Sequence, residues 1–113
     1  MTQAPRSLLF VSGERPDRFD KALASEADLV CIDLEDAVHP GHKQEARQAT
    51  MAFLLNQPDN ARLALRINSP RNLTGLRDVL AMADSGARVH ALLCPKAESA
   101  QDLAELHAWL PSA

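Results

Sequence analysis

The sequence from Leu29 to Val38, LVCIDLEDAV, holds the clearest structural signal in this 113-residue chain. It begins with a run of apolar residues and continues with three carboxylates within four positions, Asp33, Glu35 and Asp36. An apolar run of about 4 to 8 residues is typical of a buried parallel strand, and the carboxyl ends of such strands carry the polar chemistry of α/β folds. The stretch therefore predicts a buried strand that ends in candidate functional acids.

Three further apolar runs, each followed by residues that break regular structure, predict strands at Ser7–Val11, Arg62–Ile67 and Val89–Cys94. Apolar residues at helical spacing lie between and after the strands. They predict helices at Asp17–Glu26, at Lys43–Asn56, from a cap at Asn72 through Ala83, and at Ala100–Leu110.

Strands and helices thus alternate every ~25 to 30 residues, which predicts α/β architecture with four consecutive βα units around a parallel sheet. We expect residues 1–113 to form a single domain. An open, flavodoxin-like sheet is a weaker alternative, because the sequence contains neither G-x-x-x-x-G-K-[ST] nor G-x-G-x-x-G.

The composition argues against several classes of partner. Twelve basic and fifteen acidic residues give a net charge of -3, and tyrosine is absent, so neither basic patches nor stacking platforms indicate a nucleic-acid partner. No apolar stretch approaches ~18 residues, and the N-terminus lacks the pattern of a signal peptide. We expect a cytoplasmic protein without a membrane partner, whose Cys31 and Cys94 are free thiols.

The acids of DLEDAV are the first candidate site. A carboxylate cluster at the end of a strand can hold a divalent cation, directly or through water, or can set the charge state of a neighbouring group. In the alternative interpretation, Asp33 or Asp36 only caps the next segment and Glu35 is solvated. Three neighbouring acids repel one another unless cations compensate, and this favours a functional role.

Arg66 is the second candidate. Strand alternation directs its side chain to the face opposite those of Leu65 and Ile67, and a guanidinium there can bind a carboxylate through two hydrogen bonds. The alternative is an ion pair with Glu35 or Asp36 that closes this end of the sheet. The two roles are compatible.

The segment SGERPDRFDK, residues 12–21, is a weaker candidate. Gly13 permits close approach of the backbone, and Arg15, Arg18 and Lys21 provide positive charge that suits an anion, although a solvated basic helix face fits as well. Lys96 could form a Schiff base, but pairing with strand-end acids suits it better. His39 and His42 flank Pro40-Gly41 and lack the spacing of metal ligands on a helix.

Together these motifs resemble one family. The segments RSLLFVSGERPDRFDKALASEADLVCIDLEDAV, HPGHKQEAR, LRIN and CPKAES are similar, in order and spacing, to the citrate lyase beta-subunit-like family, related to malyl-CoA lyases and metal-dependent hydroxy-acid aldolases. The resemblance implies a TIM (β/α)8 barrel of which this chain is the N-terminal half. It also implies Mg²⁺-dependent cleavage or formation of a carbon–carbon bond in a 3-hydroxyacyl thioester, with release of an oxo-acid.

The resemblance assigns roles to individual residues. Arg66 would bind the carboxylate of the oxo-acid, and Glu35 and Asp36 would lie beside the metal, acting through water or by positioning Arg66. Phe10, Arg15 and Lys21 would hold the coenzyme A portion of the substrate. The family's direct metal ligands come from the fifth and sixth units, so none is expected within this chain.

Two departures from the family pattern stand out. The family has V-P-G after its first strand, whereas this chain has Val11-Ser12-Gly13, and the chain supplies four of the eight βα units. A half barrel leaves two strand edges open, so we expect a homo-oligomer, another subunit or a longer polypeptide to cover them. The functional expectation is a lyase that binds an oxo-acid and a CoA or acyl-carrier thioester. The alternative is a non-catalytic half barrel that binds small carboxylates without metal.

Overall fold

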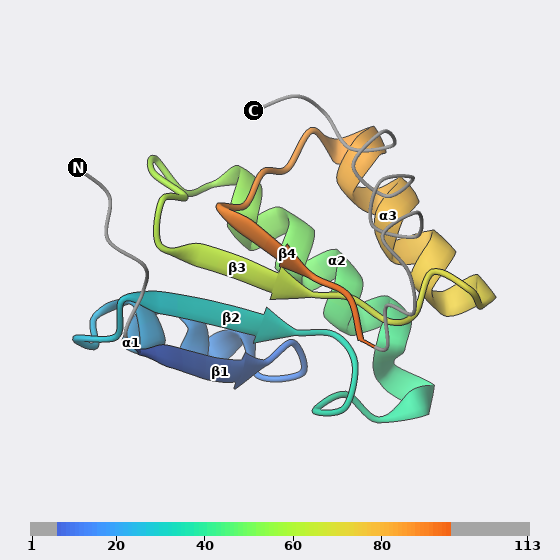
Figure 1. Cartoon of the computed structure of the whole chain (residues 1–113), viewed down its shortest axis with the longest axis horizontal. Helices are drawn as coiled ribbons and strands as arrows, with labels where there is room; N and C mark the ends of the chain where they lie inside the picture. The colour runs from blue at the N-terminus through green and yellow to red at the C-terminus, as the bar shows by residue number, and fades with distance from the viewer. Residues whose placement is uncertain (1–6, 96–113) are drawn as a thin grey trace.

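The computed structural model describes residues 7–95, which form a four-stranded parallel sheet in the order β1-β2-β3-β4 (Figure 1). The strands are β1 (Leu8–Ser12), β2 (Leu29–Asp33), β3 (Leu63–Arg66) and β4 (Ala91–Leu93). The helices are α1 (Phe19–Leu23), α2 (Lys43–Leu55) and α3 (Leu73–Ser85), with short 3-10 helices η1 (Pro16–Arg18) and η2 (Pro40–His42). The predicted alternation of parallel strands and helices is confirmed for these residues, and the helix expected at Ala100–Leu110 lies outside them.

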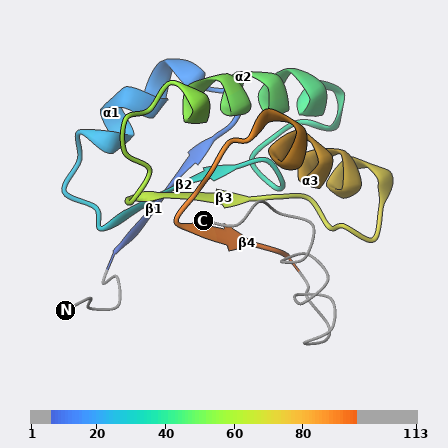
Figure 2. The same cartoon turned by 90° about the horizontal axis from the view of Figure 1, so that it is seen from above.

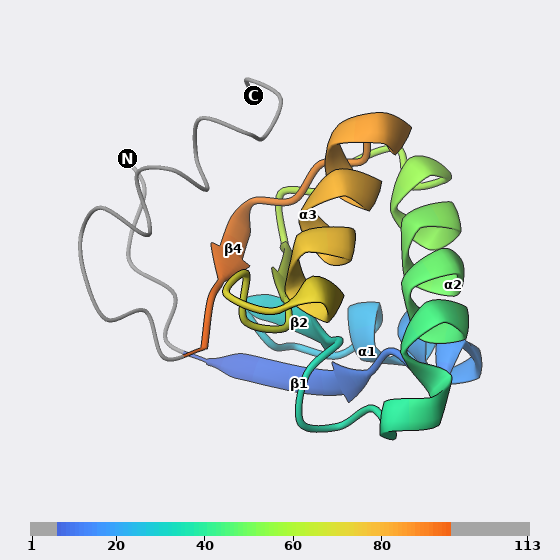
Figure 3. The same cartoon turned by 90° about the vertical axis from the view of Figure 1, so that its right-hand side faces the viewer.

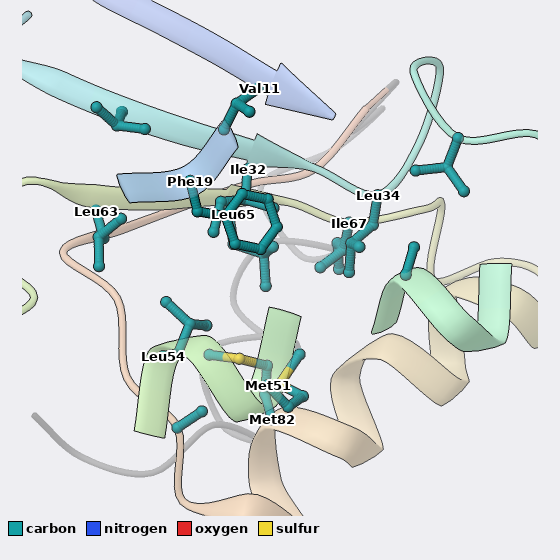
Figure 4. Packing of buried hydrophobic residues seen from close by; sticks show 14 of the residues in the cluster. Val11, Phe19, Ile32, Leu34, Met51, Leu54, Leu63, Leu65, Ile67 and Met82 are labelled. Carbon is teal, nitrogen blue, oxygen red and sulfur yellow. The ribbon is translucent and has the colours of Figure 1, made fainter. Parts of the chain in front are cut away.

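All three α-helices lie on one face of the sheet, as the views along the sheet show (Figures 2 and 3). The strand residues that face the helices are apolar and form the core with α1, α2 and α3 (Figure 4). Phe19 packs edge-on against Phe53, with ring centroids 4.9 Å apart, and so joins α1 to α2. Burial of each large apolar side chain contributes about 1.5–3 kcal/mol, so this layer is the main source of stability.

The register of the strands places the carboxyl ends of the four strands in one row. Ser12 is the partner of Asp33, Asp33 is the partner of Arg66, and Arg66 is the partner of Leu93. Because all four strands are parallel, the loops that follow them emerge at the same end of the sheet, the carboxyl end of its strands. The candidate residues of three separate loops are therefore neighbours in space.

The first helix is shorter than the sequence predicts. The expected helix at Asp17–Glu26 is divided into η1 and a five-residue α1 that ends at Leu23. Arg62, at the start of the third predicted strand, donates hydrogen bonds to the carbonyls of Leu23, Ser25 and Ala27. These carbonyls are directed to a guanidinium instead of to further helical N–H groups, which ends the helix early.

Within residues 7–95 no helix is long and apolar enough to cross a membrane.

Candidate functional site

An ion pair between β2 and β3 is the centre of the candidate site. Arg66 donates from Nε to Oδ1 of Asp33 at 3.0 Å and from Nη2 to Oδ2 at 2.6 Å. Asp33 is only 1% exposed, and its carboxylate also accepts the backbone N–H groups of Glu35 (2.8 Å) and Ala37 (3.1 Å). One buried carboxylate thus fixes both the guanidinium and the turn that follows β2.

Both partners of this pair are charged at neutral pH. Burial raises the pKa of Asp33, but hydrogen bonds from Arg66 and from the N–H groups of Glu35 and Ala37 outweigh it, so the net pKa lies below the usual range. The hydrogen bonds to Asp33 raise the pKa of Arg66, against a smaller opposing effect of burial. Arg66 therefore presents a permanent positive charge at the end of the sheet.

The role of Asp33 as the partner of Arg66 was not predicted from the sequence. The predicted partners were Glu35 or Asp36, whereas Glu35 lies at a longer 3.7 Å from Nε of Arg66 and Asp36 is exposed. The capping interpretation of Asp33 describes its bonds to the turn but misses the ion pair. Strand register, which aligns Asp33 with Arg66, is the deciding feature.

Phe10 lies beside Arg66. The Cζ atom of Arg66 is 4.8 Å from the centroid of the Phe10 ring, a cation–π contact between β1 and β3 across β2. Among residues 7–95, Nη1 of Arg66 has no hydrogen-bonding partner in the structure. The guanidinium is thus held on one side by Asp33 and on its face by Phe10, and it keeps donors for a further anion.

The remaining residues expected to bind substrate line a groove along β1 and α1. Phe10, Arg15 and Lys21 lie in the wall of this groove, whose volume is about 760 Å³, together with Arg18. Arg15 is paired with Asp17 at 2.9 Å, and both side chains are largely exposed. The structure therefore brings these three residues together, and their role toward a thioester stays a prediction.

Ser12 occupies the position where the family pattern has proline. Its hydroxyl donates to the carbonyl of Ala37 at 2.7 Å and accepts the N–H of Glu14 at 3.1 Å. The next residue is Gly13. A Cβ atom at this position would lie 2.8 Å from Cδ2 of Leu34, so a side chain would fit only if Leu34 moved. The substitution thus adds a tie between the loops after β1 and β2.

Two further features of the sequence have clear structural roles. Glu14 accepts the N–H of His39 at 2.8 Å and lies 2.7 Å from Nδ1 of His42, so the two histidines connect adjacent loops.

Cys31 is buried, and this burial, with a smaller effect of Asp33, raises the pKa of its thiol to about 12. Cys94 is also free, as expected, and Lys96 lies outside the described residues.

The described residues do not form a complete metal site. Among residues 7–95 no group of three or more Asp, Glu, His or Cys side chains is arranged to hold an ion. Glu35 and Asp36 are oxygen donors of the kind that Mg²⁺ prefers, but the ion usually combines one or two carboxylates with water and substrate oxygens. The two carboxylates therefore fit a position beside such an ion, in contact through water, and residues 7–95 offer no third side chain for it.

The fold and the motifs match one known family throughout. The sequence profile of the HpcH/HpaI aldolase/citrate lyase family matches residues 6–113. The chain belongs to this family. The predicted relationship to citrate lyase beta-like proteins and malyl-CoA lyases is thereby confirmed.

Curated relatives include both predicted groups. The citrate lyase subunit beta-like protein of Mycobacterium tuberculosis is 41% identical over 98 residues, which cover 87% of this chain and 34% of the relative. The L-malyl-CoA/beta-methylmalyl-CoA lyase of Cereibacter sphaeroides is 38% identical over 101 residues, which cover 87% of this chain and 31% of the relative. The chain thus spans about a third of the length of these relatives.

Solved structures agree with this assignment. The citrate lyase beta subunit of M. tuberculosis with oxaloacetate and magnesium matches with a TM-score of 0.77 and 39% identity, over 91% of this chain and 40% of that one. CitE from the same organism with magnesium, acetoacetate and coenzyme A matches with a TM-score of 0.74 and 36% identity, over 91% of this chain and 37% of that one. The expected α/β barrel-type fold and the expectation of Mg²⁺ for the family are confirmed.

Proposed function

We propose that the protein is a Mg²⁺-dependent carbon–carbon lyase that acts on a 3-hydroxyacyl thioester of citryl or malyl type and releases an oxo-acid. Residues 7–95 contribute its carboxylate-binding part. The observation that carries this proposal is the arrangement of Arg66. Its guanidinium is held by the buried Asp33 and by Phe10, and no other residue among 7–95 uses the N–H donors of its Nη1 atom. The ion's direct ligands come from outside these residues.

The chemistry of Arg66 suits an oxo-acid. A guanidinium offers a carboxylate two parallel hydrogen bonds, which fix the plane of the carboxylate and hence the direction of the carbonyl next to it. Asp33 occupies Nε and Nη2, so Arg66 is orientated before the substrate arrives. Pre-orientation of the reacting group lowers the entropic cost of reaction.

The substrate class is supported by the solved relatives. Structures of CitE from M. tuberculosis contain magnesium with pyruvate or with acetoacetate, and one contains coenzyme A. In this chain, Phe10, Arg15 and Lys21 line one groove together with Arg18 and Asp17, and the three cations suit the phosphates of a nucleotide-bearing thioester. We assign these residues to the thioester side of the substrate and expect a homo-oligomer.

A second candidate function is a carboxylate-binding half barrel without catalysis. It needs only the Arg66 centre, which Asp33 and Phe10 hold in place without a metal ligand from residues 7–95. In this case a small carboxylate binds at Arg66 equally well with and without Mg²⁺.

Calorimetric titration with oxaloacetate, with and without Mg²⁺, tests both functions. Arg66→Met should weaken oxaloacetate binding about 10- to 100-fold, because charge-assisted hydrogen bonds contribute about 1.5–3 kcal/mol. Arg77→Met, which removes an exposed arginine from α3, is the matched control and should bind normally. Unchanged binding by Arg66→Met would overturn the assigned site. If a partner or a longer polypeptide that supplies the direct metal ligands is present, oxaloacetate affinity that does not depend on Mg²⁺ would favour the non-catalytic alternative.

A further inference from the structure

Lys43, the first residue of α2, is hydrogen-bonded to the loop that carries the candidate acids. Its ammonium donates to the carbonyl of Leu34 at 2.9 Å, to the carbonyl of Glu35 at 2.6 Å and to Oδ1 of Asn68 at 2.8 Å. An ammonium has three N–H donors, and all three are used. Lys43 is therefore a structural cation and not a free amine.

The acceptors of Lys43 belong to the two loops that meet at the candidate site. Leu34 and Glu35 form the turn after β2, whose peptide groups connect Asp33 to Asp36. Asn68 follows β3 and is two residues beyond Arg66, and its Nδ2 also donates to the carbonyl of Leu34 at 2.8 Å. Lys43 and Asn68 thus hold the same turn from two directions.

Asn68 is itself fixed by α3. Its backbone N–H and its Nδ2 donate to Oδ2 of Asp78 at 2.9 and 2.8 Å, and Asp78 is 1% exposed. The other carboxylate oxygen of Asp78 accepts from Nε of Arg47 at 2.8 Å. Since Arg47 lies one helical turn after Lys43 on α2, the two cations lie on the same side of the helix but serve different partners.

The two cations differ in charge balance. Arg47 is neutralised by the carboxylate of Asp78, whereas the three hydrogen bonds of Lys43 go to two peptide carbonyls and one side-chain amide. No carboxylate bonds directly to Lys43 among the described residues. Its positive charge therefore acts on the turn that carries Glu35 and Asp36, where several carboxylates lie close together.

We propose that Lys43 is a positioning residue that holds the turn from Leu34 to Asp36 and so keeps Glu35 beside Arg66 and Asp36 at the same end of the sheet. The effect on the turn follows from the contacts alone. The consequence for oxo-acid binding rests on the proposed function. No step of the reaction is assigned to the amine itself.

The experiment compares Lys43→Met with Arg47→Met. Arg47→Met is the matched control, because it removes a cation of the same helix face that bonds to Asp78 and Thr74 and reaches the turn only indirectly, through Asp78 and Asn68. Both substitutions should lower the unfolding temperature. Hydrogen exchange by NMR provides the deciding measurement, since the N–H groups of Glu35 and Ala37 are bonded to Asp33 only when the turn is intact.

Lys43→Met should accelerate exchange at these two amides at least tenfold, whereas Arg47→Met should leave them unchanged. Lys43→Arg, which keeps the charge and the donors, should restore slow exchange. Equal exchange in Lys43→Met and wild type, or equal acceleration in Arg47→Met, would overturn the inference. If Lys43→Met does not fold, Lys43→Gln serves in its place with the same outcomes.

Titration with oxaloacetate separates this inference from the proposed function. Lys43→Met should weaken oxaloacetate binding at least tenfold relative to Arg47→Met if both ideas are correct. If wild type does not bind oxaloacetate, the proposed function fails, and the amide exchange rates still decide the role of Lys43. Slow exchange at Glu35 and Ala37 in Lys43→Met would refute the positioning role even if the wild type binds.

Discussion

Asp33 makes more side-chain hydrogen bonds than any other residue of the described site. Its two oxygens accept four hydrogen bonds, two from Arg66 and two from the backbone of the next turn. Burial of a carboxylate is costly unless it is fully paired, and here each oxygen has two partners. The same residue thus orientates the cation that we assign to the substrate and shapes the loop beside it.

Asp33→Asn should lower the free energy of unfolding at pH 7 by about 2–3 kcal/mol, because Arg66 loses its buried anionic partner but remains partly solvated. The folded-state pKa of Asp33 is below its unfolded value, so the unfolded chain takes up the proton first. The stabilisation is complete above about pH 4 and is lost as the pH falls through the folded-state pKa. Urea unfolding between pH 7 and pH 2 measures this dependence.

The wild type should lose more stability in acid than Asp33→Asn does. Asp84→Asn, at an exposed position of α3, is the control and should follow the wild type. Parallel curves for wild type and Asp33→Asn would show that the carboxylate is not stabilised by its partners.

At the residue scale, the sequence predicted the direction of side chains better than it predicted their partners. Alternation along β3 indicates that Arg66 leaves the apolar layer, and the structure agrees. The pairing with Asp33 depends on the register between β2 and β3, and neither strand encodes that register by itself. Lys43 and Asn68 lacked any local signal, because the hydrogen bond between them joins residues 25 positions apart.

Among the elements, α3 is fitted closely against the loop after β3. Asn72 caps the helix as predicted, since its Oδ1 accepts the N–H of Gly75 at 3.0 Å. A Cβ atom on Gly75 would lie 2.6 Å from the carbonyl oxygen of Asn68 and closer still to the carbonyl of Ser69. The helix can approach the Asn68 loop this closely only because residue 75 has no side chain.

Gly75→Ala should therefore destabilise the protein by about 2–4 kcal/mol, although alanine is otherwise the better helix former. The new Cβ atom would collide with backbone atoms of Asn68 and Ser69, which cannot rotate away as a flexible side chain can. Gly41→Ala is the matched control, because a Cβ atom there meets only Nδ1 of His39 at 3.8 Å. Thermal unfolding followed by circular dichroism measures both, and equal midpoints would contradict the close approach.

The ends of helices and strands are predicted less well from sequence patterns than the presence of these elements. The buried strand β2 and the long helices α2 and α3 follow from apolar periodicity, because burial of one helix face or of a whole strand imposes that pattern. The end of α1 instead depends on Arg62, which is 39 positions from Leu23, its most distant acceptor in sequence. Long-range bonds of this kind determine where a short helix stops, and no local pattern records them.

At the scale of the whole molecule, the outer edge of β1 is an exposed apolar surface. Within residues 7–95, β1 is hydrogen-bonded to one strand only, and its Leu8, Leu9 and Phe10 are 43%, 39% and 45% exposed. Unpaired backbone groups next to large apolar side chains favour pairing with a further strand. This edge is where a half barrel would be completed, by a second copy or by another part of a longer polypeptide.

The 113-residue chain should therefore self-associate in solution, and Leu9→Lys should weaken the association at least tenfold. A lysine at this edge adds charge without removing any of the helix-facing side chains that are fully buried, so the monomer should keep its fold. Sedimentation velocity over a range of concentrations measures the effect. Leu55→Lys is the control, because Leu55 is 53% exposed at the end of α2 and belongs to no sheet edge. A wild-type chain that stays monomeric at high concentration would show that the β1 edge tolerates solvent. Equal weakening by both substitutions would place the contact on another surface.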